Sequence, residues 1–428
     1  MRAFGYTIDD AAVGSQRSDA GTIYMQVNEW LDIALASPMP EQEIDYVLAV
    51  TADNPNVTVS TFEPVVSSGT FGSVGYQASC RLRADALGSC TLSYQVVLQD
   101  GTIAESSFQV HVYEVSLGSR AFADDESGNG FYVLYKGAKA IQPQIKGTSG
   151  VKWTTSNKAV AKVNSKGQIT YAGLGSCVVQ ATFGSVTVSI PVECTYKKAY
   201  KAVANGFADM HTLLTYDQGK RMEKDFRDCS SFVSRCFWDA SLGRKIFAIG
   251  GTAGKSWALP AAEQAQWLNK QKKCIAKKAV DPSLLLAGDT VHTETQYAGP
   301  TDFYLHIDHV SLYVGNGMVL TTGGWSHLGG TIGLRSYSAD DESVRFIGRP
   351  CADPQLNVKK ATLTKKKGSA HTLQLKVQYQ KGKVKWASSN KKVATVTAKG
   401  KVTAKKKGKA TISAKVAGKT YKCKITVK

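Results

Sequence analysis

Short runs in which apolar and polar residues alternate dominate the N-terminal part of the chain. Leu92–Leu98 is one such run, and the Asp100-Gly101 pair after it predicts a hairpin turn into a second strand at Thr102–Val112. Strands at this spacing, separated by turn residues, are typical of β-sandwiches. We therefore expect an Ig-like sandwich over residues 21–115, after a loose lead-in at residues 1–20.

A second strand pattern occurs twice, at one constant offset along the chain. Val151-Lys152-Trp153 aligns with Val384-Lys385-Trp386, and the Ser-Asn and Lys-Gly turns that follow align without gaps. An internal repeat of this kind indicates two copies of one structural unit. We expect all-β domains at residues 116–196 and 355–428. Both copies resemble bacterial Ig-like group 2 domains, which serve as spacer modules on surface proteins.

Between the copies the pattern changes to helical spacing, with apolar residues at Phe232, Val233, Cys236 and Phe237. Asp228 is placed to cap this helix, which puts Cys229 in its first turn. Unpaired backbone N–H groups and the helix dipole favour a thiolate at such a position. A nucleophilic cysteine and a buried structural cysteine both remain open from this segment alone.

A histidine stands at the head of a predicted hairpin further along the chain. Alternation after His309 predicts a strand, and Gly315-Asn316-Gly317 predicts a tight turn into a second strand at Met318–Thr322. A Cys–His pair requires an imidazole that reaches the sulfur. We expect further strands at Asp289–His292 and Val344–Ile347, in a small antiparallel sheet against the cysteine helix.

Several of these segments, in this order, resemble the NlpC/P60 cysteine peptidases, which cut peptidoglycan stem peptides. The resemblance spans about residues 200 to 350 and is carried by Tyr216, Asp228-Cys229-Ser230, Gly288-Asp289 and the segment from His309 to Gly317. It implies a papain-like α+β domain at residues 197–354. The implied fold class of the whole chain is this domain together with three all-β Ig-like domains.

The resemblance also implies roles for individual residues. Cys229 would be the nucleophile and His309 the base. Tyr216 matches the family tyrosine that lines the substrate groove, and Asp228 and Ser230 match positions that bind the free amine end of the stem peptide.

The sequence departs from the family at the residue that orients the base. The family usually has His, Asn or Gln on the strand after the hairpin, and here that position falls near Thr321. A threonine hydroxyl accepts a hydrogen bond from an imidazole N–H but orients it more weakly. His327, Asp308 and His306 are alternatives for the same role.

A second departure follows the tyrosine. Many family members have a Gly-rich segment where this chain has Asp217-Gln218-Gly219-Lys220-Arg221, which is closer to variants in phage lytic proteins. This difference leaves the cleaved bond open. Downstream, Trp257 is a candidate wall of the substrate groove, and the polar insertion Thr293–His306 is placed to shape or cover it.

The charge of the chain is concentrated at its C-terminal end. The formal net charge is +19, and residues 355–428 contain 22 lysines with no arginine, aspartate or glutamate, so the remainder carries −3. Solvated lysine faces and attraction to anionic wall polymers both explain this pattern. Without arginine or a series of aromatic residues, the segment does not favour nucleic acid as a partner.

Cysteine use and hydropathy set further expectations. None of the nine cysteines forms a Cys-x-x-Cys motif, and we expect neither a metal nor another cofactor. Cys80 and Cys90 are either a disulfide or two small core residues. No apolar run has the length of a membrane helix and no export signal is visible. Membrane insertion is therefore not expected, and the chain is either a fragment of an exported protein or phage-borne.

Together these features predict a cell-wall hydrolase. It would cut peptidoglycan stem peptides through a thioester, outside the cell or at the wall, with the Ig-like domains as spacers or wall-binding units. An N-acetylmuramoyl-L-alanine amidase, or a transferase or deamidase with the same Cys–His pair, is one alternative. The other is a surface adhesin with a degenerate catalytic domain.

Overall fold

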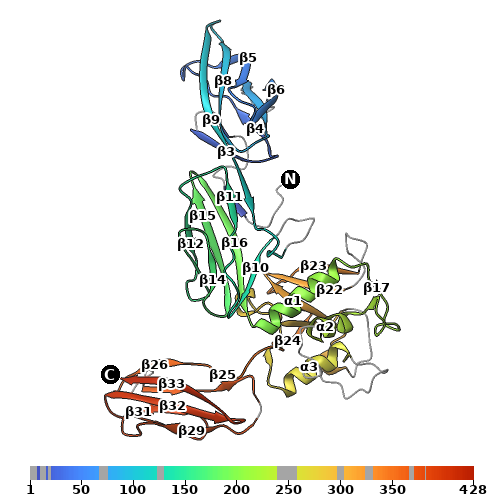
Figure 1. Ribbon diagram of the computed structural model, residues 1–428, viewed down its shortest axis with the longest axis vertical. Helices are drawn as coiled ribbons and strands as arrows, with labels where there is room; N and C mark the ends of the chain where they lie inside the picture. Colours follow the sequence, from blue (N-terminus) through green and yellow to red (C-terminus); the bar gives the residue numbers. More distant parts are fainter. Residues whose placement is uncertain are drawn as a thin grey trace. The chain divides into compact units, whose positions relative to one another are not determined.

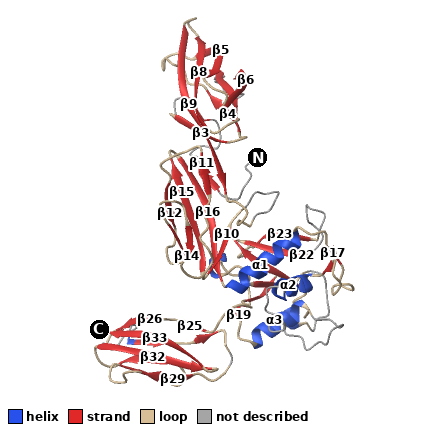
Figure 2. Cartoon of the chain, viewed as in Figure 1, coloured by secondary structure: helices blue, strands red, loops and turns tan. Residues whose placement is uncertain are grey.

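The structure is a computed structural model of the chain and divides into two compact units, Met1–Cys194 and Thr195–Lys428. It describes residues 7–9, 16–17, 21–66, 76–122, 130–238, 258–295, 303–322, 331–365, 371–380 and 382–428. Strands predominate in both units. Figure 2 shows that the three α-helices of the described residues belong to one part of the second unit.

Strands between residues 16 and 116 form two sheets that enclose one apolar core. One sheet contains β3 (Thr22–Gln26), β5 (Ile44–Ala52), β8 (Gly88–Leu98) and β9 (Ile103–Ser116). β11 (Gln144–Lys146) extends this sheet by pairing with the last residues of β9, and its Ile145 packs against the next core. The other contains β2 (Gln16–Arg17), β4 (Trp30–Ala34), β6 (Val57–Val66) and β7 (Tyr76–Ala84). Cys80 and Cys90 are both buried in this core with free thiols, so the disulfide alternative is wrong.

One long strand runs through two cores. The first part of β9 contributes Val110 and Val112 to the core just described, and its last residues contribute Tyr113 and Val115 to the next. The next core is built on β1 (Thr7–Asp9), β10 (Tyr132–Tyr135), β12 (Lys152–Thr155), β13 (Ala161–Val163), β14 (Ile169–Tyr171), β15 (Gly175–Phe183) and β16 (Val186–Thr195).

The lead-in expected at residues 1–20 is not wholly loose. Thr7–Asp9 pairs antiparallel with β16, and Gln16–Arg17 pairs in parallel with β4. Each short strand satisfies backbone groups at the edge of a sheet that would otherwise be left unpaired. Hydrophobic alternation did not reveal them because two or three residues are too few to show a period.

The C-terminal strands reproduce the fold of the earlier copy. They are β25 (Gln355–Leu356), β26 (Lys360–Leu363), β27 (Thr372–Gln374), β28 (Val377–Gln378), β29 (Lys385–Ser388), β30 (Ala394–Val396), β31 (Lys401–Ala404), β32 (Gly408–Val416) and β33 (Lys419–Val427). The hairpin β15–β16 corresponds to β32–β33, and Trp153 and Trp386 pair with Ala181 and Ala414. The structure thus preserves the constant offset seen in the sequence.

Equivalent glycines show why the repeat requires these residues. Gly167 and Gly400 both have positive φ, and each lies against the indole of its own copy. A Cβ at Gly167 would lie 2.6 Å from Cζ2 of Trp153, and one at Gly400 would lie 2.9 Å from Cζ2 of Trp386. Glycine therefore provides both the turn and the room for the tryptophan.

The helices and a six-stranded antiparallel sheet form the first part of the second unit (Figure 1). The sheet has the order β19 (Cys274–Ala276), β24 (Val344–Gly348), β20 (Thr290–Thr293), β21 (His309–Gly315), β22 (Met318–Thr322) and β23 (Ile332–Ser336). The helices are α1 (Lys197–Met210), α2 (Cys229–Phe237) and α3 (Ala261–Lys270). Short elements complete this part: β17 (Thr215–Tyr216), β18 (Phe226–Arg227), η4 (Pro282–Leu284) and η5 (Tyr304–His306).

The Gly288-Asp289 turn fixes the start of β20. Gly288 has a φ of +93°, and a Cβ there would lie 2.5 Å from the Cβ of Ala199 on α1. Asp289 is fully buried and accepts hydrogen bonds from Arg349 Nη2 at 2.7 Å and from the Leu286 N–H at 2.9 Å. Burial raises the pKa of Asp289, and the Arg349 charge opposes that shift. This motif of the sequence is therefore structural.

His292 on β20 is buried behind the candidate site. Its Nδ1 donates to the carbonyl oxygen of Ala261 at 3.1 Å, and its Nε2 lies 3.0 Å from Oγ1 of Thr290. Burial lowers the pKa of His292 to about 3. The ring is consequently neutral in the folded chain at every pH above this value.

His292 should make the second unit sensitive to acid. The pKa of His292 is lower in the folded chain than in the unfolded chain. Its contribution to the free energy of unfolding is therefore complete above about pH 6.5 and is lost as the pH falls toward 3. Within that window we expect the free energy of unfolding to fall by about 1.4 kcal/mol per pH unit. Calorimetry of the full chain between pH 7 and 4 measures this slope.

The matched variants are His292→Gln and His211→Gln, the latter at an exposed histidine. The first variant should reduce the slope of unfolding free energy against pH for the second unit, whatever its effect on stability at pH 7. The second should leave the slope unchanged. Equal slopes in the wild type and His292→Gln would contradict the prediction.

Candidate active site

The first turn of α2 is fixed by a reciprocal capping box. Asp228 Oδ1 accepts a hydrogen bond from the Ser231 N–H at 2.6 Å, and the Asp228 N–H donates to Ser231 Oγ at 2.9 Å. This satisfies two backbone donors that a helix start would otherwise leave free. Cys229 is thereby held as the first helical residue, as the sequence predicts.

Neighbouring elements hold α2 in place. The apolar residues predicted for its inner face are all buried: Phe232, Val233, Cys236 and Phe237. The helix packs on β21 and β22. From α3, the buried Gln264 donates through Nε2 to the Ser230 carbonyl at 2.8 Å and to Ser234 Oγ at 3.1 Å. Sequence patterns did not indicate this support, because a glutamine on an amphipathic helix usually faces solvent.

The sulfur of Cys229 lies against the strand that carries His309. Cys229 is only 6% exposed, and its Sγ lies 3.9 Å from the carbonyl oxygen of Asp308. Burial raises the pKa of this thiol to about 12, and the charge of Asp228 adds to the shift. The Val310 N–H and the Arg221 charge act in the opposite direction without cancelling it.

The helix start predicts a Cys229 thiolate, but in the resting protein burial favours the protonated thiol. At a helix N-terminus, N–H groups and the dipole favour negative charge, but here loss of hydration outweighs them. At neutral pH the group is a thiol. A base must remove its proton when it reacts.

His309 is the first residue of β21 and is oriented by two hydroxyl groups. Its Nε2 lies 2.7 Å from Thr321 Oγ1 and 3.4 Å from Ser311 Oγ. Ser311 in turn donates to Thr321 Oγ1 at 2.9 Å. Burial lowers the pKa of His309, and Asp308 and Asp228 act against that shift. The imidazole is therefore neutral at pH 7 and able to accept a proton.

The structure distinguishes among the candidates for the orienting residue. Thr321 contacts the imidazole directly, whereas the Asp308 carboxylate accepts from the N–H and the hydroxyl of Thr295, at 2.7 and 2.8 Å. His306 lies in the η5 turn with positive φ, and His327 is outside the described residues. The catalytic role of Thr321 stays a prediction.

Ser311 is the member of the hydroxyl pair that the sequence analysis missed. It follows His309 by two positions on β21, so the two side chains share one face of the strand. That period was a usable signal. The two-residue spacing of His309 and Ser311 was overlooked because the apolar alternation of Val310, Leu312 and Val314 on the other face is the stronger pattern.

Two of the residues predicted to bind substrate, Asp228 and Ser230, are the chain neighbours of Cys229. Tyr216 lies on β17, whose parallel partner β18 leads directly into Asp228. Tyr216 is 36% exposed, and Gln218 Nε2 donates to its hydroxyl at 3.3 Å. Trp257 is outside the described residues, as is part of the polar insertion before His309.

Arg221 lies against the Asp228 carboxylate, to which the resemblance assigns binding of a substrate amine. Its Nε lies 2.8 Å from Asp228 Oδ2, and its Nη2 donates to Ser230 Oγ at 2.6 Å and to the Ala258 carbonyl at 3.1 Å. The Nε–H bond is not directed at Oδ2, so this contact is one of adjacent charges rather than a linear hydrogen bond. Both side chains of the pair are nearly buried.

The comparisons with known proteins identify one segment of the chain. A family model, bacterial Ig-like domain (group 2), matches residues 354–427. Residues 354–427 are a group 2 bacterial Ig-like domain. That match does not include the Cys229 helix, and no curated protein matches the chain.

Solved structures similar to this chain include fibronectin(III)-like modules and an insect immune protein. The fibronectin(III)-like modules of CbhA from Clostridium thermocellum are 17% identical over 45% of this chain and 93% of that chain, with a TM-score of 0.19. The insect immune protein hemolin is 10% identical over 95% of this chain and 97% of that chain, with a TM-score of 0.20. TM-scores of this size support no conclusion about this chain.

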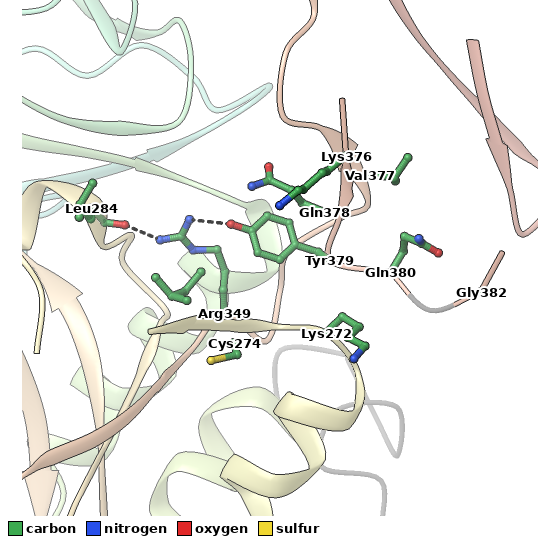
Figure 3. A pocket seen from close by; sticks show the side chains of 11 residues that line it. Lys272, Cys274, Leu284, Arg349, Lys376, Val377, Gln378, Tyr379, Gln380 and Gly382 are labelled. Atoms are coloured by element: carbon green, nitrogen blue, oxygen red, sulfur yellow. Dashed lines mark hydrogen bonds between the residues drawn. The ribbon is translucent and has the colours of Figure 1, made fainter. Parts of the chain in front are cut away.

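A cavity of about 690 Å³ lies where the group 2 Ig-like domain meets the end of α3 (Figure 3). Arg349 lines it and donates to the Tyr379 hydroxyl at 3.4 Å and to the Leu284 carbonyl at 2.8 Å. Lys272 and Lys376 also line it. Neither Cys229 nor His309 does, so the cavity is separate from the candidate active site.

Two further observations concern the described residues alone. Among them, no group of three or more His, Cys, Asp or Glu side chains is arranged to hold a metal ion. No helix in this part of the chain is long and apolar enough to cross a membrane.

The hydroxyl pair should set the tautomer of His309. Thr321 Oγ1 accepts from Ser311 and still has one lone pair, so we expect it to accept from the His309 Nε2–H, in the tautomer that leaves Nδ1 unprotonated. Thr321→Val would leave a buried donor without its partner. We expect the Nδ1–H tautomer of His309 to appear in this variant, measured by ¹⁵N NMR of the imidazole nitrogens.

Thr321→Ser is the matched control, because it keeps the hydroxyl. Its spectrum should show the same tautomer as the wild type. An unchanged His309 spectrum in Thr321→Val would show that Thr321 does not orient the ring.

Proposed function

We propose that this protein is a cysteine peptidase that hydrolyses amide bonds in the stem peptides of peptidoglycan. One observation carries the proposal: a cysteine at the first position of a capped helix lies against a strand that begins with a neutral, hydroxyl-oriented histidine. Nucleophilic catalysis by a thiol needs a base within reach of the sulfur, and His309 is the residue next to Asp308, whose carbonyl oxygen lies 3.9 Å from Cys229 Sγ. The resemblance of the surrounding motifs to NlpC/P60 peptidases supports peptidoglycan as the substrate.

The proposed reaction has two steps. In the first, His309 takes the proton of Cys229 as the sulfur attacks the amide carbon, and the protonated imidazole then gives this proton to the leaving amine. In the second, His309 removes a proton from water as it attacks the thioester. The imidazolium then returns this proton to the departing sulfur, so the acid product leaves and the Cys229 thiol is regenerated.

The pKa shifts of Cys229 and His309 favour general-base catalysis by a neutral imidazole over a resting thiolate–imidazolium pair. The resting thiol is protonated and the resting imidazole is neutral, because burial disfavours the charged form of each. Charge therefore develops only as the carbon–sulfur bond forms. The backbone N–H groups at the start of α2 are fixed dipoles suited to the developing oxyanion.

The other domains support a location at the bacterial surface. The group 2 Ig-like domain and its internal copy contribute no residue to the candidate site described above. Their proposed role is to act as spacers or wall-binding units for an extracellular enzyme.

Replacement of Cys229 by alanine tests the activity. We expect the wild type to release fragments cut within the stem peptide from purified peptidoglycan, and Cys229→Ala to release none, with products identified by mass. Cys236→Ala is the matched control, because Cys236 is buried in the same helix but is not at its first turn. This variant should retain activity.

The products also discriminate among the alternatives. Release of intact stem peptides that depends on Cys229 would identify an amidase that cuts at the sugar–peptide junction. No Cys229-dependent product from several wall types would contradict the proposal and favour a protein substrate or the adhesin.

The Arg221–Asp228 pair bears on which peptides are accepted. Asp228 Oδ1 already accepts from Ser231 and Ser230, and Oδ2 faces Arg221. An incoming ammonium group would have to displace Arg221 to reach the carboxylate. We therefore expect the enzyme to prefer peptides whose amino end is in an amide linkage, in contrast to the free amine that the resemblance implies.

Arg221→Gln should change this preference. We expect it to raise cleavage of a free-amine stem peptide about tenfold relative to its N-acetylated form, because the Asp228 charge becomes available. The ratio of kcat/KM values for the two peptides is the measurement. Lys220→Gln removes a charge from the same loop, where the ammonium lies over the Phe226 ring, and should leave the ratio unchanged.

A measurement without substrate keeps this test independent of the activity. The rates at which a cationic and an anionic methanethiosulfonate modify Cys229 report the local charge. The wild type should favour the anionic reagent more strongly than Arg221→Gln does. If both ratios are the same in the two proteins, Arg221 does not control charge selection at this site.

A further inference from the structure

One face of the group 2 Ig-like domain is covered by lysines. In the sheet β26-β33-β32-β29, inward positions such as Ile412, Cys423 and Ile425 are buried, and alternate positions point outward. The outward positions carry six exposed lysines, which we call the lysine face: Lys360, Lys385, Lys409, Lys415, Lys422 and Lys424.

Strand register brings these charges close together. Lys360 is directly opposite Lys424, and Lys385 is directly opposite Lys415. Opposite positions on paired strands lie about 5 Å apart, and like charges there destabilise a sheet. Lys422 lies two residues from Lys424 on the same strand and is diagonal to Lys415. The charges thus form a continuous row across all four strands.

The domain supplies no counter-charge to this row. Residues 355–428 contain no aspartate or glutamate. Within the described part of the chain, no ion pair includes a residue of the lysine face. Among the described residues, no side chain offsets the repulsion, which leaves water and dissolved ions to do so.

The earlier copy shows that the fold does not need three of these lysines. At the offset that relates Trp153 to Trp386, Lys409, Lys415 and Lys422 correspond to Ser176, Thr182 and Ser189. These residues occupy the same register positions of the hairpin β15–β16. The same two-strand unit folds with hydroxyl residues at these positions, so folding does not account for Lys409, Lys415 and Lys422.

The chemistry of the face points to phosphate groups along a chain. Lysine offers compact point charges that bind phosphate, whereas planar bidentate recognition of carboxylates relies on arginine, which the domain lacks. The other outward positions of these strands are Ser, Thr or Ala, with no aromatic ring on which a base could stack. A flexible polymer with one phosphodiester per unit can contact several of these lysines at once.

We propose that the lysine face is a binding surface for a linear polyol-phosphate polymer. Binding is electrostatic and multivalent, and it requires no contact with the Cys229 site. The surface would hold the enzyme at an anionic wall. The proposal stands without the proposed peptidase activity.

The test measures binding of the full-length Cys229→Ala chain to purified poly(glycerol phosphate) at several salt concentrations. The face variant is Lys409→Ser, Lys415→Thr and Lys422→Ser, which introduces the residues of the earlier copy. The control variant is Lys391→Ser, Lys399→Ser and Lys406→Ser, which removes the same charge from exposed turn positions. Both variants keep the core residues of the domain.

We expect the face variant to lose affinity about tenfold more than the control. The slope of log affinity against log salt should fall by roughly 2, because fewer phosphates are neutralised and fewer counterions are released. Equal losses in the two variants would overturn the proposal in favour of a general effect of net charge. Equal or tighter binding of single-stranded oligo(dT) or polyglutamate would overturn the assignment of a polyol phosphate, as would no binding of the polymer at physiological salt.

Discussion

The candidate site depends on the carboxylate of Asp228. One oxygen caps α2 through the Ser231 N–H, which fixes Cys229 as the first helical residue. The other oxygen faces Arg221, which ties the loop after β17 to the helix. The same charge raises the pKa of Cys229 and works against the lowering of the His309 pKa. Helix geometry and the proton affinities of Cys229 and His309 are therefore coupled through one side chain.

This coupling explains why Arg221 matters for chemistry as well as for structure. An unpaired carboxylate beside the sulfur would strongly oppose a developing thiolate. Arg221 reduces that opposition, since its charge acts to lower the thiol pKa. A cationic substrate group that replaced Arg221 would have to do the same. In the proposed function, the pair would link the charge of the accepted peptide to the reactivity of the cysteine.

Sequence patterns were sufficient where a period or a motif was long enough to read. The hairpin after His309, the helix after Asp228 and the internal repeat correspond to β21–β22, α2 and the hairpins β15–β16 and β32–β33. The patterns were insufficient where contacts join distant segments. Arg221 meets Asp228 and Ala258 through tertiary packing, and the capping role of Asp228 did not indicate that its second oxygen was taken.

Burial was the other quantity that local patterns could not supply. A helix start predicts a stabilised thiolate only if the sulfur stays hydrated, and nothing near Cys229 in sequence indicated that the Asp308 carbonyl would cover it. The papain-like assignment of residues 197–354 remains part of the proposal for function. The group 2 Ig-like domain at residues 354–427 is established by the family match.

The continuity of β9 has a mechanical consequence for the first unit. A strand that begins in one core and ends in the next leaves no flexible linker between Val112 and Tyr113. Tension along the chain would pass through the hydrogen-bonded ladder of β8 and β9 rather than straighten a hinge. The two sandwiches should therefore resist extension together. Unfolding of either core would remove part of the packing that holds β9 in the other.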